Sequence, residues 1–385
     1  MNLLIIPSWY SSKNAPLNGI FFKELAVALS RRGHNVTLID VSFHGRHDLF
    51  NLNNFHLTYQ NDEGVHVYAL KMPSFYLLSR ISFIQIAIFK MLLFFVFRKL
   101  SKKENKFDII HAHSFYPAGY CACKLSEQYK IPLVVTEHSS GVLNKIYKGE
   151  KLHLLKYTVN HCNKFICVSS ALKQSICSQI KTNKKLIVIP NMYSSIFSYS
   201  NFRKKNNEFV FFSIGSFINS KRHILTVSCF DKAFKDKSNV KLRIAGSGEL
   251  YGILHKQIHE NNLSEKIQLL GLLNRKQIKN ELDNCDSFIL ASAYETFGIV
   301  YIEAMACGKP VITARNGGAN DIINETNGIL VDVDNKEQLV KAFQYMYQNA
   351  DKYDSKKIAA DCYAKYSEDA VVKQLSDIYK EIQSN

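Results

Sequence analysis

Residues Ser287 to Gly318 read SFILASAYETFGIVYIEAMACGKPVITARNGG, and their pattern is the most informative in the chain. An apolar run ends near Leu290, and after a short loop the pattern becomes helical near Gly298. A glycine, a lysine and a proline at 308–310 end the helix, and the apolar run Val311–Thr313 follows. A strand, a helix and a second strand in this order predict one βαβ unit of a parallel sheet.

The loop before this helix carries groups that suit a ligand containing phosphate. A helix start offers backbone N–H groups and the positive end of the helix dipole, and Gly298 lets a ligand approach that backbone closely. Glu295 precedes the helix, and Glu303 lies about one and a half turns inside it. The two carboxylates can accept hydrogen bonds from hydroxyls on either side of a phosphate. The pattern therefore predicts a ligand with a sugar, a phosphate and a ribose in series.

The alternation of strands and helices continues outward through both halves of the chain. In the second half, apolar runs predict strands at 209–214, 241–245 and 267–270, with a helix at 224–234. In the first half they predict a helix at 19–32 and strands at 3–6, 36–41, 65–70, 107–112, 133–136 and 164–168. The predicted fold class is α/β, with two doubly wound, Rossmann-like parallel sheets. We expect them to face an interdomain cleft, where ligands bind at the carboxyl ends of the strands.

A polar stretch without periodicity, residues 192–208, predicts a linker between the two halves. We expect an amino-terminal domain at 1–191 and a carboxy-terminal domain at 209–362, which suits a length of 385 residues. Residues 363–385 are predicted to form a final charged helix.

The composition indicates a cytoplasmic protein with anionic partners. Lys and Arg number 49 against 33 Asp and Glu, so the formal net charge is +16, which favours nucleotide phosphates, nucleic acid or acidic lipid headgroups. The nine cysteines show no Cys-x-x-Cys spacing and indicate reduced thiols. The start of the chain lacks the basic region and the cleavage site of a secretory signal. No RNA-binding aromatic motif, zinc finger or homeodomain-like helix appears, which argues against a nucleic-acid partner.

The segment 75–97 is long and apolar, and three interpretations of it stay open. It reads FYLLSRISFIQIAIFKMLLFFVF and is interrupted by Arg80, Gln85 and Lys90. The basic residues that follow it are Arg98, Lys99, Lys102 and Lys103. The segment fits a buried helix pair that covers a sheet, a helix that lies in a membrane interface beside the basic cluster, or a transmembrane span.

The spacing Glu295-x7-Glu303, within AYETFGIVYIEAMACGKPVI, resembles the signature of the retaining, two-domain (GT-B) glycosyltransferases of the GT4 family. The resemblance implies that Glu295 contacts hydroxyls of the donor sugar and that Glu303 binds the ribose. It also implies that the backbone amides of Phe297, Gly298 and Ile299 hold the diphosphate.

Further motifs of the second half resemble the same family. FFSIGSFINSKRHIL matches its phosphate-binding loop: Lys221 is present, Ser216 stands where the family usually has Arg, and Arg222 is expected to help Lys221. LRIAGSGEL and IQLLGLL match the next two strand ends and place Gly246 and Gly271 in the donor site, Gly271 near the base. A third glycine after Gly246-x-Gly248 is absent, because residue 251 is Tyr, so the NAD fingerprint fails.

The first half resembles the family's amino-terminal domain. NAPLNGIFFKELAVALSRRGHNVTLI places Gly19, flanked by Asn18, near the donor phosphates. DIIHAHS and VVTEHSSG end two strands and direct His113 and His138 to the acceptor side of the cleft, where His138 matches the family's pocket histidine. We expect His111 to point to the opposite face. The last helix resembles one that crosses back onto the amino-terminal domain.

The resemblance implies a hexosyltransferase-type glycosyltransferase that retains the anomeric configuration and needs neither a metal nor another cofactor. His138, Glu295 and Lys221 are the expected catalytic residues. The expected donor is a UDP-linked sugar, and the expected acceptor is a saccharide or a lipid-linked acceptor in the synthesis of bacterial capsule, lipopolysaccharide or a related surface polysaccharide. The expected location is the cytoplasm, with peripheral contact to the anionic inner face of the plasma membrane. A catalytically silent GT-B partner subunit and a sugar-nucleotide epimerase or phosphorylase of the same fold remain alternatives.

Overall fold

The computed structural model describes the chain except residues 11–18, 45–55, 74–81, 103–105, 201–206 and 385. Its contacts divide the chain into two compact units. The first unit comprises Met1–Val168, Leu172–Pro190 and Val371–Asn385. The second comprises Ser169–Ala171 and Asn191–Ala370. The amino-terminal unit is therefore completed by the carboxy-terminal end of the chain.

The first unit is built on an eight-stranded sheet in the order β3-β4-β2-β1-β5-β6-β7-β8. The strands are β1 (Asn2–Pro7), β2 (Asn35–His44), β3 (His56–Asp62), β4 (Val65–Pro73), β5 (Ile109–His113), β6 (Leu133–Glu137), β7 (Lys164–Cys167) and β8 (Ile187–Val188). All neighbours pair in parallel except β3, which is antiparallel to β4. The sequence did not predict β3, because this polar edge strand is largely exposed and lacks an apolar alternation.

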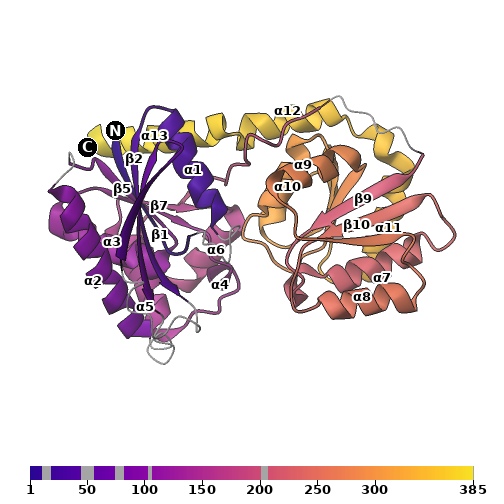
Figure 1. Ribbon diagram of the computed structural model, residues 1–385, viewed down its shortest axis with the longest axis horizontal. Helices are drawn as coiled ribbons and strands as arrows, with labels where there is room; N and C mark the ends of the chain where they lie inside the picture. The colour runs from indigo at the N-terminus through magenta and orange to yellow at the C-terminus, as the bar shows by residue number, and fades with distance from the viewer. Residues whose placement is uncertain (11–18, 45–55, 74–81, 103–105, 201–206, 385) are drawn as a thin grey trace. The chain divides into compact units, whose positions relative to one another are not determined.

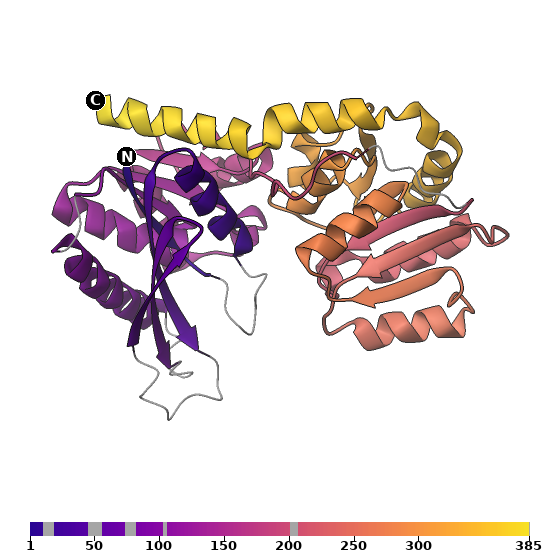
Figure 2. The same cartoon turned by 45° about the horizontal axis from the view of Figure 1, so that its top comes forward.

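Helices lie on both faces of this sheet, with α1 and α13 on one face and α2, α3 and α5 on the other (Figures 1 and 2). The helices are α1 (Ile20–Arg31), α2 (Ser82–Ser101), α3 (Tyr120–Tyr129), α4 (Ser140–Leu143), α5 (Gly149–His161), α6 (Ser170–Gln179) and α13 (Glu368–Ser384). A short π-helix, η4 (Phe115–Gly119), connects β5 to α3. The last helix thus begins at Glu368, five residues later than the sequence predicted.

The apolar segment at 75–97 contributes one long helix to the described structure, and residues 75–81 lie outside the description. Phe89, Leu93 and Val96 of α2 are fully buried, whereas the opposite side of the helix is exposed. The expectation of a largely buried helix pair is wrong for the described part, because α2 covers the sheet with one face only. None of the described helices combines the length and the apolarity that a bilayer crossing requires.

The second unit is built on a six-stranded parallel sheet in the order β11-β10-β9-β12-β13-β14. Its strands are β9 (Phe209–Ile214), β10 (Val240–Ala245), β11 (Ile267–Gly271), β12 (Ser287–Leu290), β13 (Val311–Ala314) and β14 (Gly328–Val331). The order reverses between β9 and β12, the point at which sheets of this kind bind ligands. Of the predicted linker, the described residues 192–200 and 207–208 belong to this unit by contact, and 201–206 lie outside the description.

Helices cover both faces of the second sheet, with α7, α8 and α11 on one face and α9, α10 and α12 on the other (Figure 1). They are α7 (His223–Ala233), α8 (Tyr251–Glu260), α9 (Arg275–Asn284), α10 (Ile299–Ala306), α11 (Lys336–Asn349) and α12 (Ser355–Tyr366). Phe211, Phe230, Phe234 and Phe343 form the aromatic centre of the core under α7 and α11. Each buried ring contributes roughly 1.5–3 kcal/mol by its removal from water.

Candidate active site

Two loops of the second unit meet where its strand order reverses. The loop after β9 forms a short 3-10 turn, Asn219–Lys221, and the loop after β12 carries Glu295 to the start of α10. The Lys221 Nζ lies 2.5 Å from the Glu295 Oε1, although the two residues are 74 positions apart. Both side chains stay partly exposed, so the pair can exchange its partners with a ligand.

The main chain of Glu295 is held by hydrogen bonds that the sequence analysis did not anticipate. The Glu295 N–H donates to the Asn316 carbonyl at 3.0 Å, and the Glu295 carbonyl accepts from the Gly318 N–H at 2.8 Å. A Cβ atom on Gly318 would lie 2.4 Å from the Phe297 Cα, so only glycine allows this approach. Gly318, which ends the stretch at 287–318, is therefore needed to position the main chain of Glu295 and Phe297.

The start of α10 depends on Gly298, which adopts a left-handed conformation with φ +92°. A Cβ atom there would lie 2.3 Å from the ring of Tyr301, which is buried beneath the helix start. In any α-helix the first backbone N–H groups lack intrahelical acceptors. The first turn from Ile299 can therefore offer amides and the positive dipole end to an anion.

Glu303 is buried inside α10 with a side chain only 3% exposed, and its carboxylate is paired with the Arg275 guanidinium. Arg275 is the first residue of α9, directly after the capping residue Asn274, and its guanidinium lies 5.2 Å from the centre of the Phe197 ring. Buried carboxylates are costly unless they are paired. Sequence reasoning missed Arg275, because nothing in the sequence joins it to a glutamate 28 residues away.

Arg222, a second cation predicted from the loop after β9, is paired with Asp334. Arg222 holds Asp334 by two hydrogen bonds, from Nε to Oδ1 at 2.6 Å and from Nη2 to Oδ2 at 2.8 Å. These bonds lower the pKa of Asp334. Ser216 is exposed. Of the two predicted cations, Lys221 is the one that lies beside Glu295.

Gly246 and Gly271 bring neighbouring loops together at the carboxyl ends of β9, β10 and β11. The Gly246 N–H donates to the Gly271 carbonyl at 2.8 Å. A Cβ atom on Gly246, which has φ +146°, would lie 2.0 Å from the Gly215 carbonyl oxygen. This glycine is needed for the close contact between the two loops.

In the first unit, His113 and His138 form a buried pair at the ends of β5 and β6. The His113 Nδ1 lies 3.2 Å from the His138 Nε2. The ring of Phe22, in α1, lies 4.8 Å from His113 and 5.2 Å from His138. Gly19 caps the start of the same helix with φ +72°. Asn18 lies outside the described residues.

His111 does not point away from this pair, which corrects the expectation from strand alternation. The rings of His111 and His113 lie 4.3 Å apart, because residues two positions apart on a strand share a face. The His111 ring contacts the Tyr379 hydroxyl of α13 at 2.6 Å and the Thr136 hydroxyl at 2.8 Å. Burial lowers the pKa of His111 and of His138 to about 3, so both imidazoles are neutral at pH 7.

The described residues contain no group of three or more His, Cys, Asp or Glu side chains arranged to hold a metal ion. All nine cysteines lie in the described part of the chain, and none of them forms a disulfide.

Two sequence-family models match the chain over most of its length. The model described as "Glycosyl transferases group 1" matches residues 197–361, and "Glycosyltransferase Family 4" matches residues 19–194. The chain belongs to the GT4-type glycosyltransferases. The match to the second unit includes the site residues Lys221, Glu295 and Glu303.

Similar proteins place this glycosyltransferase among known relatives. It is 28% identical over 398 residues to an uncharacterized glycosyltransferase of Methanocaldococcus jannaschii, covering 94% of this chain and 93% of that protein. It is 25% identical to the alpha-monoglucosyldiacylglycerol synthase of Streptococcus pneumoniae, covering 60% of this chain and 58% of that one. The structure of Anabaena HepE in complex with UDP superposes with a TM-score of 0.73 at 18% identity, covering 99% of this chain and all of HepE. The predicted GT-B fold is confirmed.

Proposed function

We propose that this glycosyltransferase transfers a sugar from a UDP-linked donor to a saccharide or lipid-linked acceptor, with retention, in the synthesis of a bacterial surface polysaccharide. The observation that carries the proposal is the pair of carboxylates around the start of α10, each beside a cation. Glu295 lies against Lys221, and Glu303 against Arg275. HepE, which superposes over nearly the whole chain, binds UDP, and this supports the choice of the base.

The donor fits these groups in the order sugar, diphosphate, ribose. Glu295 accepts hydrogen bonds from sugar hydroxyls, the amides at Phe297 to Ile299 receive the diphosphate, and Glu303 accepts hydrogen bonds from the ribose hydroxyls. Gly246 and Gly271 shape the loops beside the base. Arg222 would have to release Asp334 before it could reach a phosphate, so Lys221 carries the larger share of charge neutralisation.

The chemical step is a front-side displacement, in which the acceptor hydroxyl attacks from the side where the nucleotide leaves. Negative charge then grows on the departing phosphate, and Lys221 with the α10 amides stabilises it. Each such donor contributes about 2–4 kcal/mol to the barrier reduction, by analogy with oxyanion donors. The mechanism assigns no step to a metal ion, so transfer should continue in the presence of EDTA.

The acceptor side belongs to the first unit in this proposal. His113 and His138 are neutral, buried at one face of two strand ends and lined by Phe22. A neutral His138 can accept a hydrogen bond from a hydroxyl or donate one to it. A lipid-linked acceptor is supported by the similarity to an alpha-monoglucosyldiacylglycerol synthase.

The donor proposal is tested by thermal unfolding with UDP, GDP and ADP, for the wild type, Glu303→Gln and the control Glu325→Gln. Glu325 is exposed and belongs to the same unit. At a hundred times the dissociation constant, UDP should stabilise the wild type and the control by about 2.7 kcal/mol, and Glu303→Gln much less. An equal response of all three proteins would overturn the assignment of Glu303.

Product analysis separates transfer from silent binding. With a UDP-sugar and a saccharide acceptor, proton NMR of the new linkage should show the anomeric configuration of the donor. The exposed Ser216, where the family usually has Arg, favours the silent partner as the second candidate. Nucleotide stabilisation without any turnover of a panel of UDP-sugars would support that candidate.

A further inference from the structure

The outward face of α2 is apolar and basic along its whole described length. The side chains of Phe83, Met91 and Phe95 are 63%, 59% and 42% exposed. A surface helix normally places polar residues on its solvent side, because only its inner face is covered by the core. The outer face of α2 departs from this pattern.

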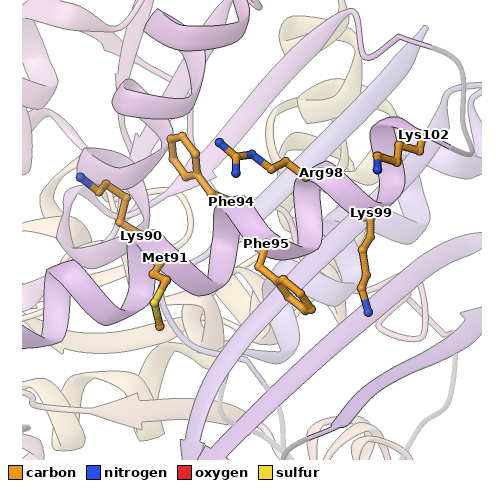
Figure 3. Close-up of a pocket in the computed structure, with 7 residues that line it drawn as sticks. All are labelled: Lys90, Met91, Phe94, Phe95, Arg98, Lys99 and Lys102. Atoms are coloured by element: carbon orange, nitrogen blue, oxygen red, sulfur yellow. The ribbon is translucent and has the colours of Figure 1, made fainter.

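Two rows of side chains make up this face, and Figure 3 shows both of them. Lys90, Phe94 and Arg98 form one row, and Met91, Phe95 and Lys99 form the other. Within each row the residues are four positions apart, which places them one above the next on a helix. Together with Lys102, these side chains line a groove of about 560 Å³.

The charge on this face has one sign. The sequence from Ser82 to Lys103 contains no Asp and no Glu, whereas Lys90, Arg98, Lys99 and Lys102 are all exposed in the structure. The Lys99 Nζ lies 4.6 Å from the centre of the Phe95 ring, so a cation and an exposed aromatic ring share one surface. Exposed apolar side chains between cations are typical of helices that lie in an anionic membrane interface.

The same helix contacts the segment that follows His113 in the first unit. The Tyr116 hydroxyl donates a hydrogen bond to the Gln85 Oε1 at 2.6 Å, and Tyr116 follows His113 by three residues. A surface bound along α2 is therefore tied by direct contact to the segment that leaves the acceptor-side strand.

We infer that the outer face of α2 docks onto an anionic lipid bilayer. Phe83, Met91 and Phe95 enter the boundary between headgroups and acyl chains, and the cations of the face contact lipid phosphates. The helix lies in the plane of the membrane and does not cross it. Only the purpose of docking rests on the proposed function: the bound membrane would hold the protein beside a lipid-linked acceptor.

The test is cosedimentation of the full chain with vesicles of phosphatidylcholine alone or mixed with phosphatidylglycerol, at low and high salt. We expect binding to the mixed vesicles, weakening with salt, and little binding to phosphatidylcholine. The variant Arg98→Glu/Lys99→Glu should bind at least about thirtyfold more weakly, since each lost cation contributes about 1 kcal/mol near an anionic surface and each added carboxylate is repelled by it. Met91→Ser/Phe95→Ser should also weaken binding, and at high salt this variant should bind less than the wild type does.

The matched control is Lys356→Glu/Lys357→Glu, which makes the same charge change at two exposed neighbours in α12 of the second unit. Control binding equal to the wild type supports docking by α2. An equal loss in both double variants would overturn it, as would equal binding to neutral vesicles or no binding to either. The UDP thermal shift of each variant distinguishes a failure of membrane docking from a failure of the proposed function. The donor site lies in the other unit, so the α2 variants should keep the thermal shift of the wild type.

Discussion

Two glycines of the second unit differ in how much space their surroundings leave for a side chain. Gly298 has a left-handed backbone, and the ring of Tyr301 occupies the space that a side chain would need. Gly252, in the first turn of α8, has no atom within 4 Å of where its Cβ would be. The two glycines therefore serve as a matched pair for separating strain from helix propensity.

Gly298→Ala should lower the free energy of unfolding by about 2 kcal/mol or more, because alanine is strained in the left-handed region and meets Tyr301. Gly252→Ala should raise it by about 0.5–1 kcal/mol, since alanine is the better helix former. Circular dichroism melting curves of the two variants measure both effects. A neutral Gly298→Ala would show that the start of α10 can adapt.

Arg275 should control the affinity for the nucleotide through Glu303. Arg275→Met removes the guanidinium that faces the buried carboxylate, so UDP should bind about tenfold more weakly, a loss of about 1.4 kcal/mol. Arg275→Lys keeps the charge and should recover part of this loss. Calorimetric titration with UDP measures the affinity, and wild-type affinity in Arg275→Met would contradict the positioning role.

The sequence predicted the carboxylates of this site better than their supports. Glu295 and Glu303 follow from local spacing around one helix start, which a single stretch of chain contains. Arg275 acts through its contact with Glu303, 28 residues away in the chain. Gly318 acts through its close approach to the main chain of Phe297. Such contacts depend on the packed fold, and no local pattern encodes them.

At the scale of elements, strands with an apolar run were predictable, and the polar edge strand β3 was not. The strands β9 and β12 are apolar runs that are buried over most of their length, and their residues were identified directly. The exposed strand β3 lacks such a run. For α2, the apolar sequence was correctly recognised as unusual, but its outward Phe and Met side chains made it appear more buried than it is.

The last helix is attached to the first sheet by Tyr379, whose hydroxyl contacts His111. Tyr379→Phe leaves this ring nitrogen buried without its hydroxyl partner, so the free energy of unfolding should fall by about 1–3 kcal/mol. Tyr363→Phe removes an exposed hydrogen bond to Asp369 and should cost less. Urea titrations of both variants measure the difference, and equal losses would show that α13 is not held by this contact.

For the whole molecule, the chain divides into two compact units, and each unit holds its own reporter. The single tryptophan, Trp9, lies in the first unit beside Phe22, so its fluorescence reports the unfolding of that unit. The donor site lies in the second unit. Fluorescence and nucleotide-dependent melting can therefore follow the two units separately.

Acid should destabilise the first unit before its ordinary carboxylates titrate. Burial lowers the pKa of His111 and His138 to about 3 and that of His113 well below its ordinary value. Below pH 6.5 these histidines are therefore protonated in the unfolded chain and remain neutral in the folded unit. Stability from these groups is complete above pH 6.5 and falls as the pH drops toward 3. Glu137 acts oppositely, since burial raises its pKa to about 7 and the folded unit gains a proton first.

The destabilisation by the three histidines is larger than the stabilisation by Glu137. We therefore expect the free energy of unfolding of the first unit to fall by a net amount on the order of 3 kcal/mol between pH 7.5 and pH 5. The urea midpoint of Trp9 fluorescence at the two pH values measures it. His138→Asn removes one of the three contributions and should reduce the loss, whereas His56→Asn, at an exposed position of the same unit, should leave it unchanged. A midpoint that stays constant or rises on acidification would mean that the buried histidines accept protons in the folded unit, and a neutral His138 could then no longer be assumed in the transfer step.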